Sequence, residues 1–396
     1  MKRPVITILG GCGHVGLPLA IALADVGNLV RIYDIDDVAV ATVNDGRLPF
    51  IEHGAEHVLK RCVAEGQLSA SADPSTVAGA EVVIVVIGTP VDEHLNPDPG
   101  SIRTALARCI DHLQDGQLII LRSTLYPGVT ARVARLLSEH GLDVDVAFCP
   151  ERIAEGRAMV ELSTLPQIVA GTTERAFERA AEVFGDLAPS IVRLEPEEAE
   201  LAKLFTNTWR YIKFAVANQL YMFANNHGLD YEKIRAAIRE DYPRAADLPG
   251  AGFAAGPCLL KDTMQLAAFS DNSFVLGHSA MLVNEGLPLY VVSRLSERFD
   301  LAELTVGILG MAFKADSDDT RDSLSYKLKR LLRFRARAVL TTDPLVTSDP
   351  ELLPLDEVLG RADLLIIGVP HAEYRDLSPR QPVADVWNAL GRGTVV

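Results

Sequence analysis

The sequence predicts an α/β protein with a doubly wound N-terminal domain, a central region built on one long helix, and a smaller α/β domain at the C-terminus. Two patterns indicate this: apolar, β-branched runs alternate with helical patterns at both ends of the chain, and one long helical periodicity separates them. The chain has 396 residues, which at roughly 150 residues per domain suggests two or three domains. We therefore expect domains at residues 1–195, 196–296 and 297–396.

The first domain is predicted from six short apolar runs. They lie at residues 5–9, 29–33, 82–87, 118–121, 144–148 and 168–170. Continuously apolar runs are typical of parallel strands that helices cover on both faces. Segments 15–26 and 102–113 fit such helices, and Gly27 lies where a helix C-terminal glycine is expected.

The central region has a different period. Between residues 197 and 227, which include neither Gly nor Pro, apolar side chains recur in steps of three and four. They are Ala202, Phe205, Trp209, Ile212, Val216, Leu220 and Phe223. The corresponding helix would be about 45 Å long at 1.5 Å per residue, so we expect a spine between domains or a dimer contact.

The α/β alternation returns after residue 300. Apolar runs lie at residues 304–309, 338–341, 364–368 and 383–386. These runs predict the second, smaller α/β domain.

Composition excludes several classes of protein. The 38 basic and 53 acidic side chains give a net charge of −15, whereas non-specific nucleic-acid binding needs an excess of Lys and Arg. The apolar run near the N-terminus is too short for a signal peptide, and no stretch approaches the ~20 apolar residues of a spanning helix. The five cysteines form no CxxC pair, which indicates reduced thiols in a cytoplasmic protein and no metal site.

A glycine-rich segment, GCGHVG, follows the first predicted strand and includes Val15 where the first helix begins. Gly11 allows a tight turn, Gly13 lets the backbone approach a pyrophosphate, and Gly16 lets helix and strand pack closely. Asp34 closes the second strand, where a carboxylate would bind the ribose hydroxyls of NAD and repel the 2′-phosphate of NADP. The context predicts a Rossmann-like NAD site; the alternative is a glycine turn without a ligand.

Two further strand ends agree with this interpretation. Thr89 follows the strand at 82–87, and Thr124 follows the strand at 118–121. Open α/β sheets bind ligands at the carboxyl ends of their strands. Thr is also a common cap in loops, so a cofactor contact and a capping role both stay open.

Cys258 lies in the segment GPCLLKD, close to Lys261 and Asp262. This polar setting is unlike that of a structural core cysteine and suits a nucleophile. A lone cysteine is, however, usually a buried hydrophobe. Both interpretations stay open from the residues alone.

The predicted long helix carries a polar stripe of Lys203, Asn207 and Arg210 at i, i+4 and i+7. A solvated face is one explanation. Asn207 nevertheless lies among mostly apolar neighbours, where an amide needs a partner.

Taken together, these segments resemble the UDP-glucose/GDP-mannose dehydrogenase family along essentially the whole chain. The matching motifs are, in order, GGCGHVG, GTP at 88–90, STLYPG at 123–128, CPERIAEG at 149–156, ELAKLFTNTWR at 200–210, GFAAGPCLLKD at 252–262 and GMAFKADSDDTRDS at 310–323. The resemblance implies oxidation of C6 of a nucleotide sugar to a carboxylate by two NAD⁺. It also implies an N-terminal NAD domain, a central dimerisation region, a Rossmann-like C-terminal domain that binds the nucleotide sugar, and a homodimer.

The resemblance makes Cys258 the nucleophile that forms a thiohemiacetal and then a thioester. Lys203 and Asn207 match residues that steady the oxyanion. Asp262 matches the carboxylate that orients the hydrolytic water together with Lys203. Glu151 matches a general acid/base or water-positioning residue.

Other positions match residues around the two ligands. Thr124 matches a contact to water and nicotinamide, and Lys314 a contact to the nucleotide sugar. Arg321 and Lys261 match the NAD side of the site. Arg244 matches an arginine that reaches the neighbouring subunit's substrate.

The substrate signals are mixed. Arg152 stands where many glucose enzymes have an aromatic residue, and Gly256 lies in an altered glycine-rich segment, AAGP, among the predicted sugar contacts. Arg210, with VPH at 369–371, is similar to the branch that oxidises UDP-N-acetylhexosamines, whereas the Lys-Asp pair after the cysteine is similar to the glucose and GDP-mannose branches.

We therefore favour a UDP-N-acetylhexosamine (ManNAc or GlcNAc) as substrate. UDP-glucose is the alternative within this family. A two-electron β-hydroxyacid-type dehydrogenase, which relies on a lysine and needs no cysteine, and a non-catalytic nucleotide-sugar sensor are further alternatives.

Overall fold

The computed structural model describes residues 3–89, 91–92, 98 and 100–396. Pro90 of the GTP motif lies outside this range. The chain divides into two compact units, Met1–Thr206 and Asn207–Val396. No helix among the described residues is both long and apolar enough to cross a membrane.

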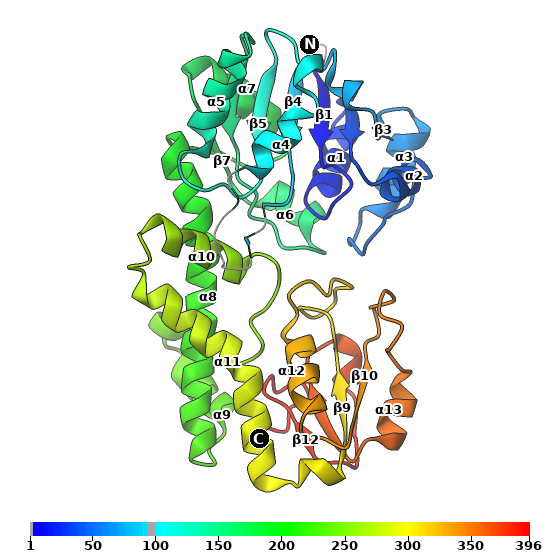
Figure 1. Ribbon diagram of the computed structural model, residues 1–396, viewed down its shortest axis with the longest axis vertical. Coiled ribbons are helices and arrows are strands. Elements are labelled where there is room, and N and C mark those ends of the chain that lie inside the picture. Colours follow the sequence, from blue (N-terminus) through cyan, green and yellow to red (C-terminus); the bar gives the residue numbers. More distant parts are fainter. Residues whose placement is uncertain (1–2, 90, 93–97, 99) are drawn as a thin grey trace. The chain divides into compact units, whose positions relative to one another are not determined.

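The first unit is built on an eight-stranded sheet with the order β3-β2-β1-β4-β5-β6-β7-β8 (Figure 1). Its strands are β1 (Val5–Leu9), β2 (Leu29–Tyr33), β3 (Leu68–Ser71), β4 (Val82–Val85), β5 (Leu118–Leu121), β6 (Asp145–Phe148), β7 (Gln167–Gly171) and β8 (Ile191–Arg193). Neighbouring strands are parallel except β6 and β7, which are antiparallel. The expectation of a parallel sheet is wrong at this pair. The chain leaves β6 and enters β7 at the same edge of the sheet, so the two strands run in opposite directions.

Helices cover both faces of this sheet. The helices are α1 (Gly16–Asp25), α2 (Asp37–Asn44), α3 (Glu56–Ala64), α4 (Ser101–Ala107), α5 (Val129–Glu139), α6 (Ala158–Thr164) and α7 (Glu174–Gly185). Alternate strand residues divide between two apolar cores: Ile84 packs with α1, α3, α6 and α7, whereas Val83 and Val85 pack with α4 and α5. Gly27 follows α1 with a φ of 96°, as expected of a C-terminal glycine. The doubly wound domain is confirmed.

The predicted long helix is present as α8 (Pro196–Asn226), and the division between the units falls within it. Its large exposed apolar side chains are Phe205, Trp209, Val216, Leu220 and Phe223. All five belong to the stripe that the sequence period predicts. The remaining stripe members, Ala202 and Ile212, are half-buried.

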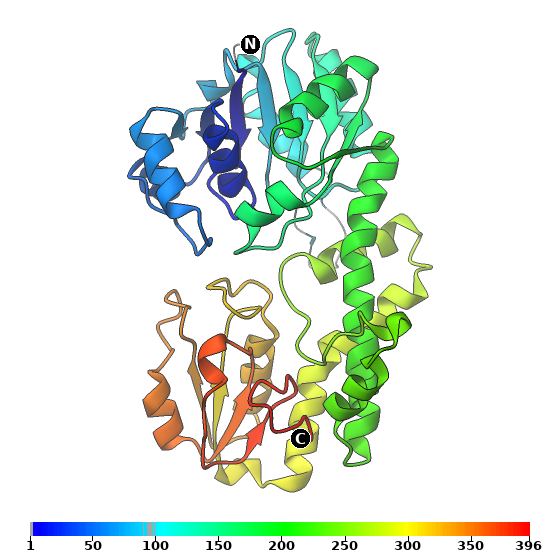
Figure 2. The ribbon, with the colours of Figure 1, turned by 180° about the vertical axis from the view of Figure 1, so that it is seen from behind.

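The second unit contains helices and a smaller sheet. The helices are α9 (Tyr231–Arg239), α10 (Leu259–Phe269), α11 (Val275–Arg298), α12 (Leu324–Arg333) and α13 (Leu355–Arg361). Its sheet has the order β10-β9-β11-β12, formed by β9 (Thr305–Leu309), β10 (Ala338–Thr342), β11 (Leu364–Ile367) and β12 (Val383–Ala384). All its strand pairs are parallel, and α12 and α13 pack on opposite faces (Figure 2). This is the second α/β domain that the sequence predicts.

Candidate active site

The glycine loop connects β1 to α1 as the sequence predicts. A Cβ added to Gly11 would lie 2.8 Å from a side chain of β2, and one on Gly16 would lie 2.7 Å from the carbonyl oxygen of Gly10, so close packing requires both glycines. A Cβ on Gly13 would meet nothing nearer than 3.9 Å. The fold itself thus leaves space beside Gly13, where a pyrophosphate would approach the backbone. Val15, at the N-cap of α1, makes no side-chain cap bond, which leaves backbone donors for an anion.

Asp34 lies at the carboxyl end of β2 and is partly exposed. Its Oδ2 accepts a hydrogen bond from the backbone N–H of Cys12 at 2.9 Å, and Oδ1 accepts one from Asp36 at 3.2 Å. A carboxylate has further lone pairs, so ribose hydroxyls can still donate to it. The glycine loop and Asp34 together fit NAD.

The loops after β4 and β5 are joined to each other. Thr89 Oγ1 donates to the carbonyl oxygen of Thr124 at 2.8 Å, and the backbone N–H of Ile87 donates to Ser123 Oγ at 2.8 Å. The structure therefore brings Thr89 and Thr124 together at the carboxyl edge of the sheet, the edge that the glycine loop also occupies.

Glu151 follows β6 and is buried against an arginine. The Arg122 guanidinium, at the end of β5, forms an ion pair with Glu151 Oε2. The backbone N–H groups of Arg152 and Ile153 donate to Glu151 Oε1 at 2.6 and 2.9 Å. Since every one of these partners is a donor, the surroundings suit a carboxylate that orients water or accepts a proton.

Glu200 fixes the start of α8 to the STLYPG segment. Its carboxylate accepts from the backbone N–H groups of Gly128 and Thr130 at 2.6 and 2.8 Å, and from Thr130 Oγ1 at 2.6 Å. Burial raises the pKa of Glu200, although these hydrogen bonds act in the opposite direction. Lys203 follows one turn later; its side chain is buried, and in the described part of the chain its ammonium group makes no hydrogen bond or ion pair.

Cys258 is exposed and lies at the N-cap of α10. The other four cysteines are buried. Burial raises the pKa of Cys12 and Cys149 to about 12 and that of Cys109 to about 11. The N-terminus of a helix favours negative charge, which suits both a thiolate and a developing oxyanion.

Asp262 lies one turn into α10 and is fully buried. Asn207 Nδ2 donates to its Oδ2 at 2.5 Å, and Lys261 Nζ lies 2.6 Å from its Oδ1. One predicted cofactor contact, Lys261, is thus engaged with the predicted water-orienting carboxylate. Asp262 is therefore the hydrogen-bond partner that the apolar sequence neighbours of Asn207 led us to expect.

Gly256 adopts a φ of +103°, and a Cβ there would lie 2.6 Å from the Phe313 ring. The altered AAGP segment therefore keeps its glycine where backbone conformation and packing both require one. Phe313 belongs to the loop after β9, which also carries Lys314 and Arg321. Arg321 pairs with Asp319 of the same loop, with Nε 2.8 Å from Oδ2.

The three predicted arginines have the following local surroundings. Arg152 bonds the carbonyl oxygen of Pro166. Arg210 is exposed on α8. Arg244 is exposed and packs over Tyr242 at 5.6 Å.

Comparison with models of protein families gives three matches, all to domains of one family. The profile for the UDP-glucose/GDP-mannose dehydrogenase family NAD binding domain matches residues 5–188, the central domain matches 197–285, and the UDP binding domain matches 307–392. The chain belongs to the UDP-glucose/GDP-mannose dehydrogenase family. It is an NAD-dependent nucleotide-sugar dehydrogenase.

Several members of the family are similar over nearly their full length. The chain is 30% identical to a UDP-N-acetyl-D-mannosamine dehydrogenase of Pyrococcus horikoshii, covering 96% of this chain and 91% of that protein. It is 31% identical to an NDP-N-acetyl-D-galactosaminuronic acid dehydrogenase of Ralstonia solanacearum, covering 93% and 91%. A solved UDP-glucose dehydrogenase of Pyrobaculum islandicum superposes with a TM-score of 0.92 at 27% identity, covering 100% and 97%.

Sequence reasoning missed parts of this dehydrogenase that support its site residues. Arg122 was not among the predicted residues. A cation directly after the apolar run LIIL could have indicated a functional residue, because ligands bind at the carboxyl ends of such strands. A buried amide pair was also missed: Asn218 of α8 bonds both the N–H and the C=O of Gly252, and its Nδ2 donates to Asn284 of α11 at 2.9 Å. This pair ties the start of the cysteine segment to two helices.

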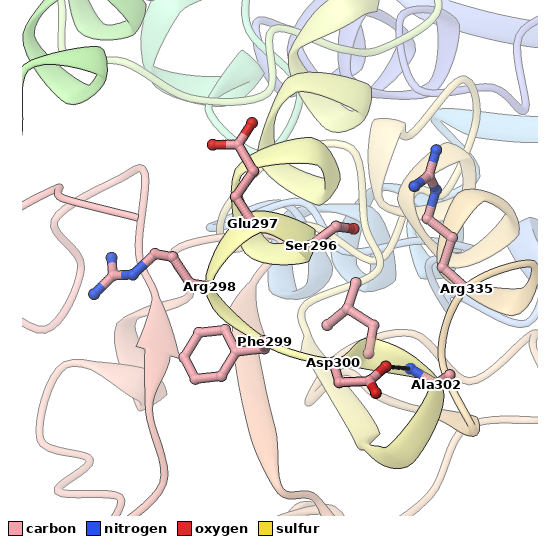
Figure 3. A pocket seen from close by; sticks show the side chains of 8 residues that line it. Ser296, Glu297, Arg298, Phe299, Asp300, Ala302 and Arg335 are labelled. Atoms are coloured by element: carbon pink, nitrogen blue, oxygen red, sulfur yellow. Dashed lines mark hydrogen bonds between the residues drawn. The ribbon is translucent and has the colours of Figure 1, made fainter.

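One hollow of the dehydrogenase lies away from the predicted residues. A pocket of about 510 Å³ lies where α11 ends. Figure 3 shows the Arg298 and Arg335 side chains beside it, with Asp300 bonded to the backbone of Ala302. None of the predicted site residues lines it.

Proposed function

We propose that this dehydrogenase oxidises the C6 hydroxymethyl group of UDP-N-acetylmannosamine to the uronate. The observation that carries the chemistry is an exposed Cys258 at a helix N-terminus, one turn before a buried Asp262 with a donor on each oxygen. The choice of sugar is supported by the UDP-N-acetyl-D-mannosamine dehydrogenases among the relatives.

NAD⁺, when bound, accepts the hydride in each of two oxidations. The first oxidation turns the alcohol into an aldehyde and releases a proton. The Cys258 thiolate then adds to the aldehyde carbon, and this thiohemiacetal is oxidised to a thioester. Water attacks the thioester, which breaks the carbon–sulfur bond, gives the carboxylate and the thiol, and releases one proton.

Five side chains have assigned roles in this scheme. Lys203 and Asn207 donate to the oxyanion of the tetrahedral species. Asp262, with Lys203, orients the water that attacks the thioester. Glu151, held by donors only, positions water or accepts a proton, and Thr124 contacts water and nicotinamide.

The remaining predicted residues surround the two ligands. We assign Gly11, Gly13, Val15, Gly16, Asp34, Thr89, Lys261 and Arg321 to the cofactor, and Arg152, Arg210, Arg244, Gly256 and Lys314 to the nucleotide sugar. Residues 1–195 would bind NAD, residues 196–296 would form the dimerisation region, and residues 297–396 would hold the nucleotide.

We further propose a cytoplasmic homodimer. The exposed apolar stripe of α8 needs a covering surface, and a two-fold contact with the same stripe would supply it. No disulfide joins any two of the five cysteines, all of which lie in the described residues, and this fits a reducing compartment. In a dimer, Arg244 would reach the substrate of the neighbouring subunit.

A substrate panel tests the proposal. Purified protein is incubated with NAD⁺ and, separately, UDP-N-acetylmannosamine, UDP-N-acetylglucosamine, UDP-glucose and GDP-mannose, and NADH is followed by absorbance. We expect the highest kcat/KM with UDP-N-acetylmannosamine and release of two NADH per sugar without free aldehyde. A higher kcat/KM with UDP-glucose would show that UDP-glucose is the substrate. No turnover with any of the four would favour the non-catalytic sensor. Release of one NADH per substrate would favour the two-electron dehydrogenase.

A further inference from the structure

Two buried ionisable side chains meet at the carboxyl edge of the C-terminal sheet. Asp343 directly follows β10, and His371 lies in the loop after β11. Strand β9 lies between these two strands. Their side chains are 0% and 1% exposed, and His371 Nε2 lies 3.1 Å from Asp343 Oδ2. The pair therefore spans the end of β9, where the loop with Lys314 begins.

The pair also binds the backbone of that loop at two places. Asp343 Oδ2 accepts from the N–H groups of Met311 and Ala312 at 2.6 and 3.0 Å. His371 Nδ1 accepts from the N–H of Asp316 at 3.2 Å. Because Nδ1 accepts, Nε2 is the ring nitrogen that donates to Asp343.

The residues between these two anchors face different parts of the proposed site. Lys314 is the lysine that we assign to the nucleotide sugar. Phe313 packs its ring against Gly256, two positions before Cys258. Asp316, at the second anchor, has a φ of 56°, in the left-handed region that Asp adopts more readily than most non-glycine residues.

The N-terminal sheet contains the counterpart of Asp343. Asp34 also directly follows a strand, β2, and also accepts from a backbone N–H in the loop after the neighbouring strand. Asp34 is partly exposed, whereas Asp343 is buried under five donors. The position that offers a carboxylate to ribose in the first sheet is therefore used in the second sheet to hold a loop.

We propose that His371 and Asp343 form a clasp that positions segment 312–316, and with it Lys314, for the nucleotide of the substrate. His371 is a positioning residue, because it acts through Asp316 and Asp343 rather than on the substrate. The inference rests on the proposed function. We therefore expect replacement of His371 to weaken nucleotide binding and to change NAD⁺ binding little.

The two contacts of the imidazole can be removed separately. His371→Gln keeps an amide N–H near the position of Nε2 but no acceptor for Asp316; His371→Asn keeps an acceptor near the position of Nδ1 but no donor for Asp343; His371→Ala removes both. Tyr374→Phe is the matched control: its ring lies edge-on to His371 at 5.6 Å, and its buried hydroxyl makes no hydrogen bond with the described residues. Circular dichroism and thermal unfolding identify the variants that fold.

The measurements are the Kd for UDP by calorimetry, and the KM values for UDP-N-acetylmannosamine and for NAD⁺. We expect His371→Ala to raise the Kd for UDP and the sugar-nucleotide KM about tenfold, roughly the effect of one or two lost hydrogen bonds. His371→Asn, which still holds Asp316, should recover part of this loss. The KM for NAD⁺ should stay within about twofold in every variant, and Tyr374→Phe should match the wild type.

Three results would overturn the inference. Unchanged UDP affinity in folded His371→Gln and His371→Ala would show that the clasp positions nothing. An equal rise in both KM values with a fall in thermal stability would show a purely structural role. A wild-type protein that bound no UDP would overturn the proposed function and the inference together, so the two failures are distinguishable.

Discussion

Alkylation of the native protein with iodoacetamide should modify Cys258 far faster than the other four cysteines. Only Cys258 is exposed, and the thiols of Cys12 and Cys149 have pKa values raised to about 12 by burial. At pH 8 a thiol with a pKa of about 12 is ionised in about one molecule in 10⁴, whereas an ordinary exposed thiol with a pKa of about 8.5 is about one-quarter ionised.

The rate ratio follows from these fractions. Ionisation alone separates the two kinds of thiol by about 10³, and the greater nucleophilicity of the weaker acid offsets about 30-fold of this. A ratio of about 30 remains before burial restricts access of the reagent. Raising the pH from 7 to 9 should increase labelling of Cys12 and Cys149 about tenfold per pH unit, because their thiols stay far below half-ionised in this range.

The assay is time-resolved labelling followed by peptide mass spectrometry, with NADH formation measured on the same samples. Activity should fall in step with modification of Cys258, and UDP-N-acetylmannosamine should protect it. Cys258→Ser, which lacks the fast site, and protein unfolded in urea, in which all five thiols react alike, are the controls. Labelling of Cys12 or Cys149 at a rate within about tenfold of Cys258 would refute the reasoning, as would full activity after complete modification of Cys258.

The other predictions concern the cofactor, the chemistry and the dimer. Asp34→Ala should narrow the preference for NAD over NADP, measured as the ratio of kcat/KM values, and equal values in the wild type would contradict the assignment. Cys258→Ser should lose overall turnover but form some product slowly through an ester, whereas full two-step turnover of Cys258→Ala would exclude covalent catalysis. Asp262→Ala should slow hydrolysis of the thioester enough to leave an adduct on Cys258 that intact mass spectrometry detects. Lys203→Ala removes one oxyanion donor and should lower the turnover rate about 10²–10³-fold. Sedimentation should show a dimer at micromolar concentration, which Trp209→Glu weakens, and a monomeric wild type would reject the two-fold contact.

The sequence predicts the elements whose signals are local. The strands at 5–9, 29–33 and 118–121 agree with the structure to the residue, because each is rich in apolar and β-branched side chains. Strand β3 was missed because its sequence, LSAS, has only one fully buried side chain, and β8 is a three-residue edge strand with two exposed residues. The direction of β7 could not be predicted, because an apolar run has the same pattern in either direction.

The same distinction holds for the site. The glycine loop with Asp34 and the Cys258–Asp262 segment are short motifs, so their residues could be named in advance. The partners of Glu151 and His371 could not be, since Arg122 and Asp343 lie 29 and 28 positions away along the chain. Such pairs come together only because strands far apart in the sequence end at the same edge of one sheet.

The antiparallel pairing of β6 and β7 has a consequence for the segment between them. In a parallel crossover, a connection leaves the ligand edge of the sheet and must return to the opposite edge before the next strand begins. Here the chain leaves β6 and re-enters the sheet at the same edge, so segment 149–166, which includes Glu151, is tethered to that edge at both ends. Glu52 fastens its middle, accepting from the backbone N–H groups of Gly156 and Ala158 at 2.8 and 2.7 Å. Because β7 runs antiparallel to β6, segment 149–166 is held at both of its ends and in its middle. This segment carries the Glu151 carboxylate.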